Sequence, residues 1–141
     1  MAHGEQLFKE IALLEEKCFS DAWSEKSLNE TFEYDYNHLL VEERGGKVVG
    51  YIIYSDVQRE AELLRIAVDQ KARRQGIGKL LISEMLEELR ESDAEKVMLE
   101  VRAHNVAAVR LYKSFGFKDI FVRENYYSNP EDDALIFQLM L

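Results

Sequence analysis

Apolar residues recur every three or four positions in four stretches of the chain, which is the period of an amphipathic α-helix. In the first stretch they include Leu7, Ile11 and Leu14. Ser24 and Asn105 precede two other stretches and are suitable N-caps, because their side-chain oxygens can accept a bond from an unpaired amide of the first turn. The expected helices span residues 5–18, 24–34, 76–91 and 105–115.

Short apolar or alternating stretches, typical of β-strands, lie between and after these helices. Gly45 and Gly46 separate the first two and have the composition of a two-residue hairpin turn. The strands on either side of helix 76–91 imply a parallel crossover, because a parallel pair needs a long connection. The expected strands span residues 38–44, 47–56, 60–68, 96–101, 117–124 and 134–141. We therefore predict one α/β domain over residues 1–141, a mixed sheet flanked by helices.

Composition excludes several functions. The net charge of −9 argues against a general nucleic-acid binder and is compatible with a basic substrate. No apolar run approaches the roughly 18 residues of a membrane span, and no secretion signal is visible, so we expect a cytoplasmic protein without a membrane partner. The single cysteine excludes an internal disulfide. The three histidines show no metal-ligand spacing, and no metal is expected.

The sharpest chemical signal is R-x-x-G-x-G at residues 73–78, between a strand and a helix. A helix N-terminus exposes unpaired amides with partial positive charge, and glycines let an anion approach the backbone closely. Leu81 stands where a dinucleotide-binding G-x-G-x-x-G needs its third glycine, while Arg73 and Leu80 exclude a P-loop. A plain turn at the start of a helix is the alternative interpretation. Four basic residues cluster here: Lys71, Arg73, Arg74 and Lys79.

This segment resembles the acyl-CoA pyrophosphate loop of the GNAT acetyltransferases. The sequences L-E-V-R-A-H-N at residues 99–105 and L-Y-K-S-F-G-F at residues 111–117 are also similar to that family, and the similarity extends over nearly the whole chain from about residue 7. Within the family the chain most resembles the ribosomal-protein alanine N-acetyltransferases of the RimI type. The segments that carry this closer resemblance are A-W-S-E at 22–25, I-A-V-D at 66–69 and R-E-N-Y-Y at 123–127.

The resemblance implies a GNAT fold and acetyl-CoA as co-substrate. GNAT chains usually begin with an edge strand, which we expect to be missing, because only residues 1–4 precede the first helix. One backbone amide of the strand at 66–68 would polarise the thioester carbonyl. Asn105 would contact the cofactor, although capping its helix is an equally good explanation. The implied cofactor-binding residues are Ile66, Ala67, Val68, Arg73, Arg74, Gln75, Gly76, Ile77, Gly78, Lys79 and Asn105.

The resemblance also implies a catalytic pair, Glu100 as general base and Tyr112 as general acid. An α-amino group has a pKa of about 8 and needs only a mild base, acting directly or through a water. The alternatives are an ion pair between Glu100 and Arg102 or Arg65, and core packing of Tyr112. We interpret Cys18 as a buried apolar residue, because no neighbour in the sequence would lower its pKa.

Three aromatic residues in loop-like segments, Trp23, Tyr126 and Tyr127, resemble positions that line the peptide groove of the family; anchoring of loops in the core is the alternative. The implied reaction acetylates a protein N-terminal amine, specifically the N-terminal alanine of a small-subunit ribosomal protein with a basic tail. A GNAT acting on lysine side chains or on a polyamine is a second hypothesis. A non-catalytic acyl-CoA-binding module is a third, disfavoured because both catalytic residues are present. We expect His104 at the surface and residues 131–133 in a solvated acidic turn.

Overall fold

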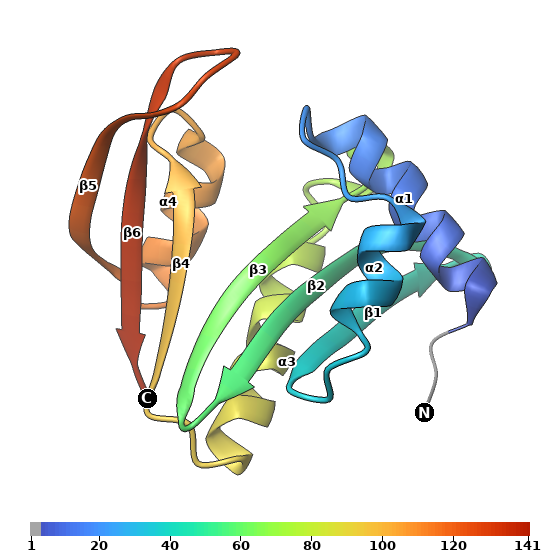
Figure 1. The fold of residues 1–141 in the computed structure, drawn as a ribbon, viewed down its shortest axis with the longest axis horizontal. Coiled ribbons are helices and arrows are strands. Elements are labelled where there is room, and N and C mark those ends of the chain that lie inside the picture. Colours follow the sequence, from blue (N-terminus) through green and yellow to red (C-terminus); the bar gives the residue numbers. More distant parts are fainter. Residues whose placement is uncertain (1–3) are drawn as a thin grey trace.

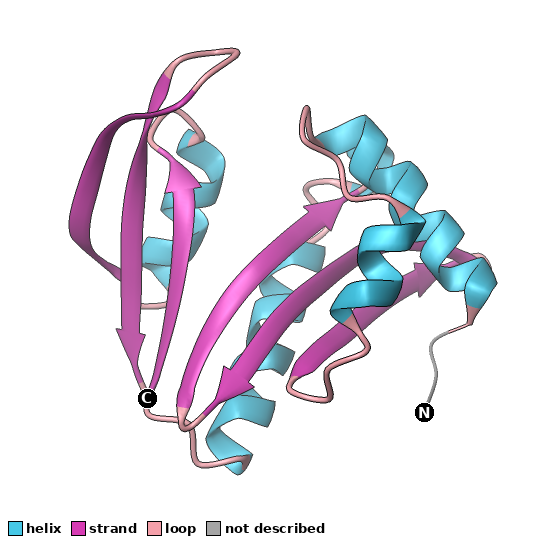
Figure 2. Cartoon of the chain, viewed as in Figure 1, coloured by secondary structure: helices cyan, strands magenta, loops and turns pink. Residues whose placement is uncertain are grey.

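A six-stranded mixed sheet forms the centre of the protein in a computed structural model that describes residues 4–141 (Figures 1 and 2). The strand order is β1-β2-β3-β4-β6-β5, and every neighbouring pair is antiparallel except β3 and β4. The strands are β1 (Asn37–Arg44), β2 (Lys47–Val57), β3 (Glu60–Val68), β4 (Lys96–Arg102), β5 (Lys118–Tyr127) and β6 (Asp132–Met140). The helices are α1 (Glu5–Cys18), α2 (Glu25–Thr31), α3 (Ile77–Glu91) and α4 (Val106–Ser114), with a 3-10 turn at Gln70–Ala72.

The helices cover the two faces of the sheet in pairs (Figure 1). On one face α1 and α2 pack against β1–β3 through a core that includes Ile11, Leu28 and Tyr51. On the other face α3 and α4 pack through a larger core that includes Leu81 and Phe137. The β4–β6–β5 half of the sheet carries no helix on the first face, so that face of these strands is open (Figure 2).

The parallel pair β3 and β4 separates after three residue pairs, which end with Glu62 opposite Met98. Beyond that point β3 continues on β2 as far as Val68, and β4 continues on β6 as far as Arg102. The two strands therefore diverge as a V, visible in Figure 1. The predicted mixed sheet with a parallel crossover is confirmed.

Local signals placed most boundaries correctly. The Ser24 hydroxyl accepts the Ser27 amide at 3.1 Å, and Asn105 Oδ1 accepts the Ala108 amide at 3.2 Å, so both predicted N-caps are confirmed. The second helix, predicted to reach residue 34, ends at Thr31. In the described chain from residue 4 onward no strand precedes α1, while residues 1–3, on which the expected loss of the edge strand also depends, lie outside the described residues.

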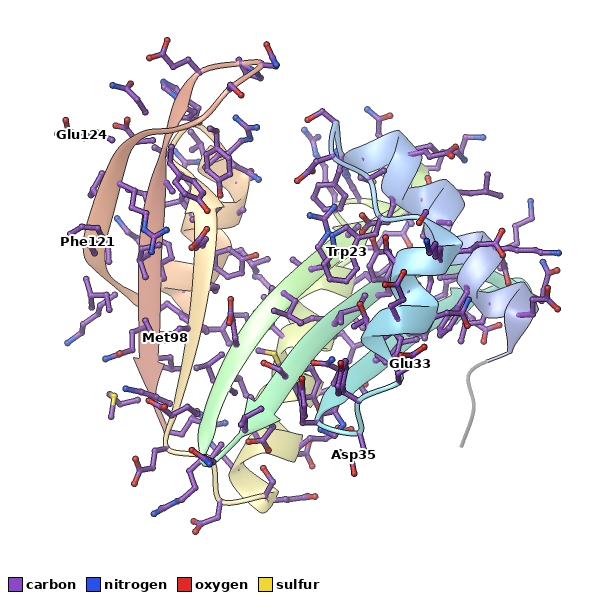
Figure 3. All side chains as sticks on the ribbon, viewed as in Figure 1. Trp23, Glu33, Asp35, Met98, Phe121 and Glu124 are labelled. Atoms are coloured by element: carbon purple, nitrogen blue, oxygen red, sulfur yellow. The ribbon has the colours of Figure 1, made fainter. Side chains whose placement is uncertain are left out.

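The last two strands are longer than predicted, because β5 continues to Tyr127 and β6 begins at Asp132. Tyr126 and Tyr127 therefore lie in a strand, and the expectation of a loop was wrong. Their pairing with β6 contains two register shifts, which interrupt the alternation that reveals a strand in sequence. Phe121 and Glu124, also on β5, lie at the outer edge of the sheet (Figure 3).

Candidate active site

A cavity of about 950 Å³ opens between the end of β3, the start of α3 and α4. Ten of the eleven residues expected to bind the cofactor line it, and so does Tyr112. The exception is Gln75, whose side-chain oxygen instead accepts a bond from Arg44 Nη1 at 3.4 Å. The other lining residues are Cys18, Phe19, Ala72, Ala107, Ala108, Arg110, Leu111 and Ser114.

The glycine loop takes the form that an anion site requires. Gly76 caps α3 with φ +76°, a left-handed conformation that glycine adopts without strain. Leu80 is the residue whose amide bonds back to Gly76, so the amides of the three residues before it have no partner within the helix. Gly78 lies against α4, because a Cβ there would approach Leu111 Cδ2 to 3.3 Å.

The chemistry of the lining fits a CoA thioester. The N-terminal amides of α3, together with Arg73, Arg74 and Lys79, offer a positive field to a pyrophosphate. Within residues 4–141, the edge of β3 that faces β4 has no strand partner beyond Glu62 and can pair with an extended amide-bearing chain. Among residues 4–141, no group of three or more His, Cys, Asp or Glu side chains is arranged to hold a metal ion.

Cys18 is not the isolated buried residue that the sequence predicts. It is half-buried at the rim of the cavity, with Sγ 3.9 Å from Arg73 Nη2 and 3.9 Å from the Val68 carbonyl oxygen. The end of α1 lies against the loop that follows β3, a long-range contact that helical periodicity does not reveal. The expectation of a buried apolar residue was therefore wrong, because Cys18 is only half-buried.

Glu100 and Tyr112 lie on opposite faces of β4. Val97, Leu99 and Val101 of this strand are buried in the core beneath α3 and α4, so by alternation Glu100 projects from the open face. Tyr112 lies on the α4 side, 4% exposed, with its ring edge-on to Phe117 and Phe137. Burial raises the pKa of the Tyr112 hydroxyl, and the residue lines the cavity. Strand β4 therefore lies between the two groups.

The charged neighbours of Glu100 differ from those expected. Neither Arg102 nor Arg65 pairs with it; instead Arg123 Nη1, from β5, lies 3.8 Å from Glu100 Oε1. Glu62 faces the same region from β3. Burial, and then the negative charge of Glu100, raise the pKa of the Glu62 carboxyl.

The predicted peptide-binding aromatics come from the two walls of this open face. Tyr126 and Tyr127, at the end of β5, pack edge to face at 5.1 Å. Trp23 lies in the connection between α1 and α2, beside β3 (Figure 3). Burial raises the pKa of Tyr127, and the charge of Glu100 adds to this effect. None of these three aromatic residues lines the cavity between β3, α3 and α4.

Comparison with known proteins identifies the family. The sequence profile of the acetyltransferase (GNAT) family matches residues 8–117. The chain belongs to the GNAT family. It is 35% identical over 128 residues to the [ribosomal protein bS18]-alanine N-acetyltransferase of Escherichia coli strain K12, covering 89% of this chain and 86% of that protein. This GNAT chain is an N-acetyltransferase, as the resemblance implies.

Solved structures agree. The crystal structure of the ribosomal-protein-S18-alanine N-acetyltransferase from Escherichia coli superposes with a TM-score of 0.90 at 31% identity, over 99% of this chain and 91% of that one. A crystal structure of the NatC complex bound to Gag peptide and CoA gives 0.85 at 25% identity, over 98% of this chain and 92% of that one. The predicted GNAT fold is confirmed, and members of the family use acetyl-CoA as donor. In residues 4–141, no helix is both long and apolar enough to cross a bilayer.

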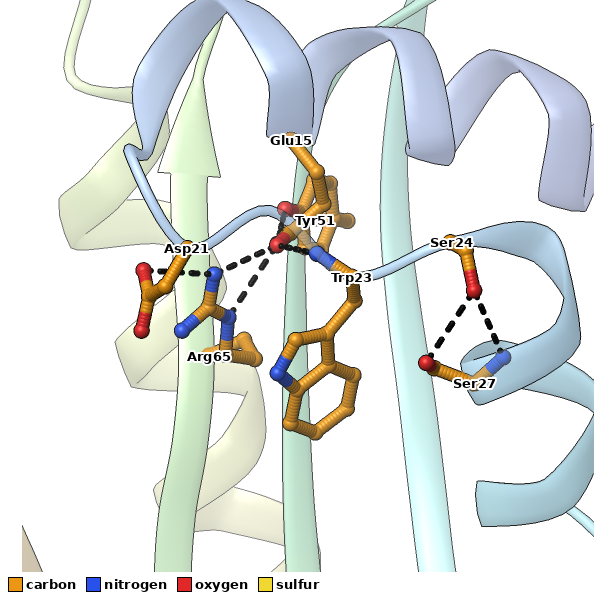
Figure 4. A network of polar contacts seen from close by, with 7 residues as sticks. All are labelled: Glu15, Asp21, Trp23, Ser24, Ser27, Tyr51 and Arg65. Carbon is orange, nitrogen blue, oxygen red and sulfur yellow. Dashed lines mark hydrogen bonds and ion pairs between the residues drawn. The ribbon is translucent and has the colours of Figure 1, made fainter.

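The GNAT chain also contains a buried polar network that sequence reasoning missed (Figure 4). Glu15 of α1 is fully buried and accepts bonds from Arg65 Nη2 at 2.5 Å, from the Trp23 amide at 2.9 Å and from the Tyr51 hydroxyl. The Arg65 guanidinium lies 4.0 Å from the centre of the Phe19 ring and 5.1 Å from that of Trp23. The network fixes the α1–α2 connection on β3. The feature of the sequence that could have indicated this network is Arg65, an arginine within an apolar strand.

A second polar contact corrects the expectation for the acidic turn. His104 is exposed as predicted, but its Nδ1 lies 2.7 Å from Asp132 Oδ1, and its amide donates to Asp132 Oδ2 at 3.1 Å. Asp132 is 6% exposed, not solvated. Burial opposes its ionised form, yet the hydrogen bonds from His104 and from the Asp133 amide outweigh that effect and lower the pKa of Asp132.

Proposed function

We propose that this acetyltransferase modifies the N-terminal α-amine of a protein, specifically the N-terminal alanine of a small-subunit ribosomal protein. One observation carries the proposal: a CoA-sized cavity and an open, aromatic-lined face meet at the V between β3 and β4. The resemblance to an enzyme named for bS18 alanine, extending over 89% of this chain, supports the choice of substrate.

The proposed base is Glu100. It projects from the open face of β4, where an incoming amine does not have to cross the cavity that would hold acetyl-CoA. The neutral amine forms a bond from nitrogen to the thioester carbon while the carbon–sulfur bond breaks. The amine proton passes to the Glu100 carboxylate, directly or through a water.

The proposed acid is Tyr112, on the cavity side of β4. Because burial raises the pKa of its hydroxyl, Tyr112 carries its proton at neutral pH and is present in the form that can donate it. The proton would pass to the sulfur as the carbon–sulfur bond breaks, so that CoA leaves as the thiol, and Tyr112 would then regain a proton from solvent. Tyr112→Phe is expected to lower kcat about 10- to 100-fold with little change in acetyl-CoA affinity.

The test uses two peptides and acetyl-CoA. One begins Ala-Arg with a free N-terminus and contains no lysine; the other differs from it in having a blocked N-terminus and one added lysine. Mass spectrometry is expected to show one added acetyl group on the first peptide alone. Modification of the second peptide would instead indicate a lysine-directed enzyme. Modification of spermidine but of neither peptide would indicate a polyamine acetyltransferase, and CoA binding without any turnover would indicate a binding module.

A further inference from the structure

Arg123 shares the open face of the sheet with Glu100. In the register of the sheet Glu100 is opposite Ile136, and Arg123 is opposite Ala134, two residues along the same strand β6. Residues two apart on a strand point to the same face, so both side chains project to the side from which the amine must come. Within residues 4–141, Arg123 is the ion-pair partner of Glu100, with 3.8 Å between Nη1 and Oε1.

Glu62 approaches Glu100 from the other side. It lies opposite Met98 at the last paired position of β3 and β4, which places it on the same face as Glu100, two residues further along β4. Because the strand order is β3-β4-β6-β5, Glu100 stands between a like charge on β3 and an opposite charge on β5. Two neighbouring carboxylates compete to remain ionised, and a nearby cation favours the one it touches.

Aromatic rings hold the cation in this position. The Arg123 guanidinium lies 5.2 Å from the centre of the Tyr126 ring, and Tyr126 packs edge-on against Tyr127. Arg102 lies 4.2 Å from the centre of Tyr127 and donates to the Pro130 carbonyl at 2.9 Å. The side chain of Arg123 is 48% exposed, so its ion pair adds little to folding stability. The contact does place a positive charge beside Glu100 at the open face.

We infer that Arg123 is a positioning residue for acetyl transfer: it keeps Glu100, rather than Glu62, as the ionised carboxylate at the open face of β4. The inference rests on the proposed function, in which Glu100 accepts the amine proton. Other charged or titratable groups on this face are Arg102, two residues along the same strand, and Tyr127 on β5, on which Glu100, Arg102 and Asp21 of the α1–α2 connection act. Arg65 is already held by Glu15.

The test is the pH dependence of kcat/KM, calculated for the neutral form of the peptide amine, for wild type and Arg123→Gln. Loss of the cation makes the Glu100 carboxylate easier to protonate. The acid limb of the profile, where kcat/KM falls at low pH, is therefore expected to move to higher pH by about half a unit to one unit. Arg123→Lys keeps the charge and is expected to retain most of the wild-type profile. Adding Glu62→Gln to Arg123→Gln removes the like charge and is expected to move the limb back toward lower pH.

The matched control is Arg59→Gln, because Arg59 pairs with Asp93 and Glu95 at the far end of the sheet, and its profile should match wild type. An unmoved acid limb in Arg123→Gln, or a uniform loss of activity at every pH that Glu62→Gln does not reverse, would overturn the inference. Glu100→Gln separates it from the proposed function. If Glu100→Gln loses activity while Arg123→Gln keeps the wild-type limb, only the role of Arg123 fails; if Glu100→Gln stays active, the proposed base itself is wrong.

Discussion

The cavity proposed to hold acetyl-CoA, here called the donor side, and the open face proposed to receive the amine, here called the acceptor side, are built in different ways. They meet at the V between β3 and β4. The donor cavity takes most of its polar groups from one continuous segment, from the end of β3 to the first turn of α3, and many of them are backbone amides. The acceptor face takes side chains from four places: Trp23 before α2, Glu62 on β3, Glu100 on β4, and Arg123 with its neighbouring tyrosines on β5.

This difference has a functional consequence. If backbone amides and glycines bind acetyl-CoA as proposed, the donor side can remain constant among enzymes with different amine substrates, because the donor is the same for all of them. Side chains from separate elements can be exchanged one at a time, so selectivity for the amine is expected to reside on the acceptor side. The following predictions use substitutions on each side to test that separation.

The largest effect is expected on the acceptor side, from Glu100→Gln. Loss of the proposed base should lower kcat/KM for the peptide about 100- to 10,000-fold, while the Kd for acetyl-CoA stays at its wild-type value, because Glu100 does not line the cavity. Steady-state kinetics and calorimetric titration with acetyl-CoA measure the two quantities. An equal weakening of acetyl-CoA binding would contradict the separation of the two sides.

A substitution at the junction should affect both sides. Arg65→Met removes the partner of the fully buried Glu15 and releases the connection that carries Phe19, at the cavity, and Trp23, at the acceptor face. Breaking a buried pair in this way costs about 3–5 kcal/mol, which corresponds to a fall of about 10 °C or more in Tm. Thermal unfolding should show this loss, and KM should rise for both substrates. Glu42→Gln is the matched control, because its pair with Arg44 is exposed; a similar loss there would contradict the assignment.

The smallest of these effects is expected on the donor side, from Gly76→Ala. A Cβ at Gly76 would meet no atom within 4 Å, so the change acts only through the left-handed backbone at φ +76°, at a cost of about 1–2 kcal/mol. KM for acetyl-CoA should rise at most about 30-fold, with kcat for the peptide little changed. Gly46→Ala is the control, because Gly46 has φ +78° in the β1–β2 turn. It should lose similar stability without any change in KM.

Much of the donor side could be predicted from the sequence. The R-x-x-G-x-G segment, the Asn105 cap and residues 66–68 all lie at the cavity, where the family resemblance placed them. Gln75 is the exception, because a side chain on an exposed loop can turn toward any neighbour, here Arg44. The catalytic roles of Glu100 and Tyr112 stay predictions, although the structure places both at the V.

Less of the acceptor side could be predicted from the sequence. Periodicity predicted β5 too short, because its pairing with β6 shifts register between Asp119 and Phe121 and again after Arg123. It also gave no indication that Asp132 would be buried against His104, or that Glu15 would be buried with Arg65. In each case the partner lies at least 28 residues away in the chain.

The sequence by itself determined the order of helices and strands, the two side-chain caps and the position of the glycine loop, because each depends on interactions within about one helical turn or one hairpin. Only the tertiary structure decided that Glu100 pairs with Arg123. That contact requires β6 to lie between β4 and β5, and it requires the register shift that turns Arg123 to the open face. A slip of one residue in a strand moves each of its side chains to the opposite face, so the register of distant strands determines which charges meet at the reacting amine.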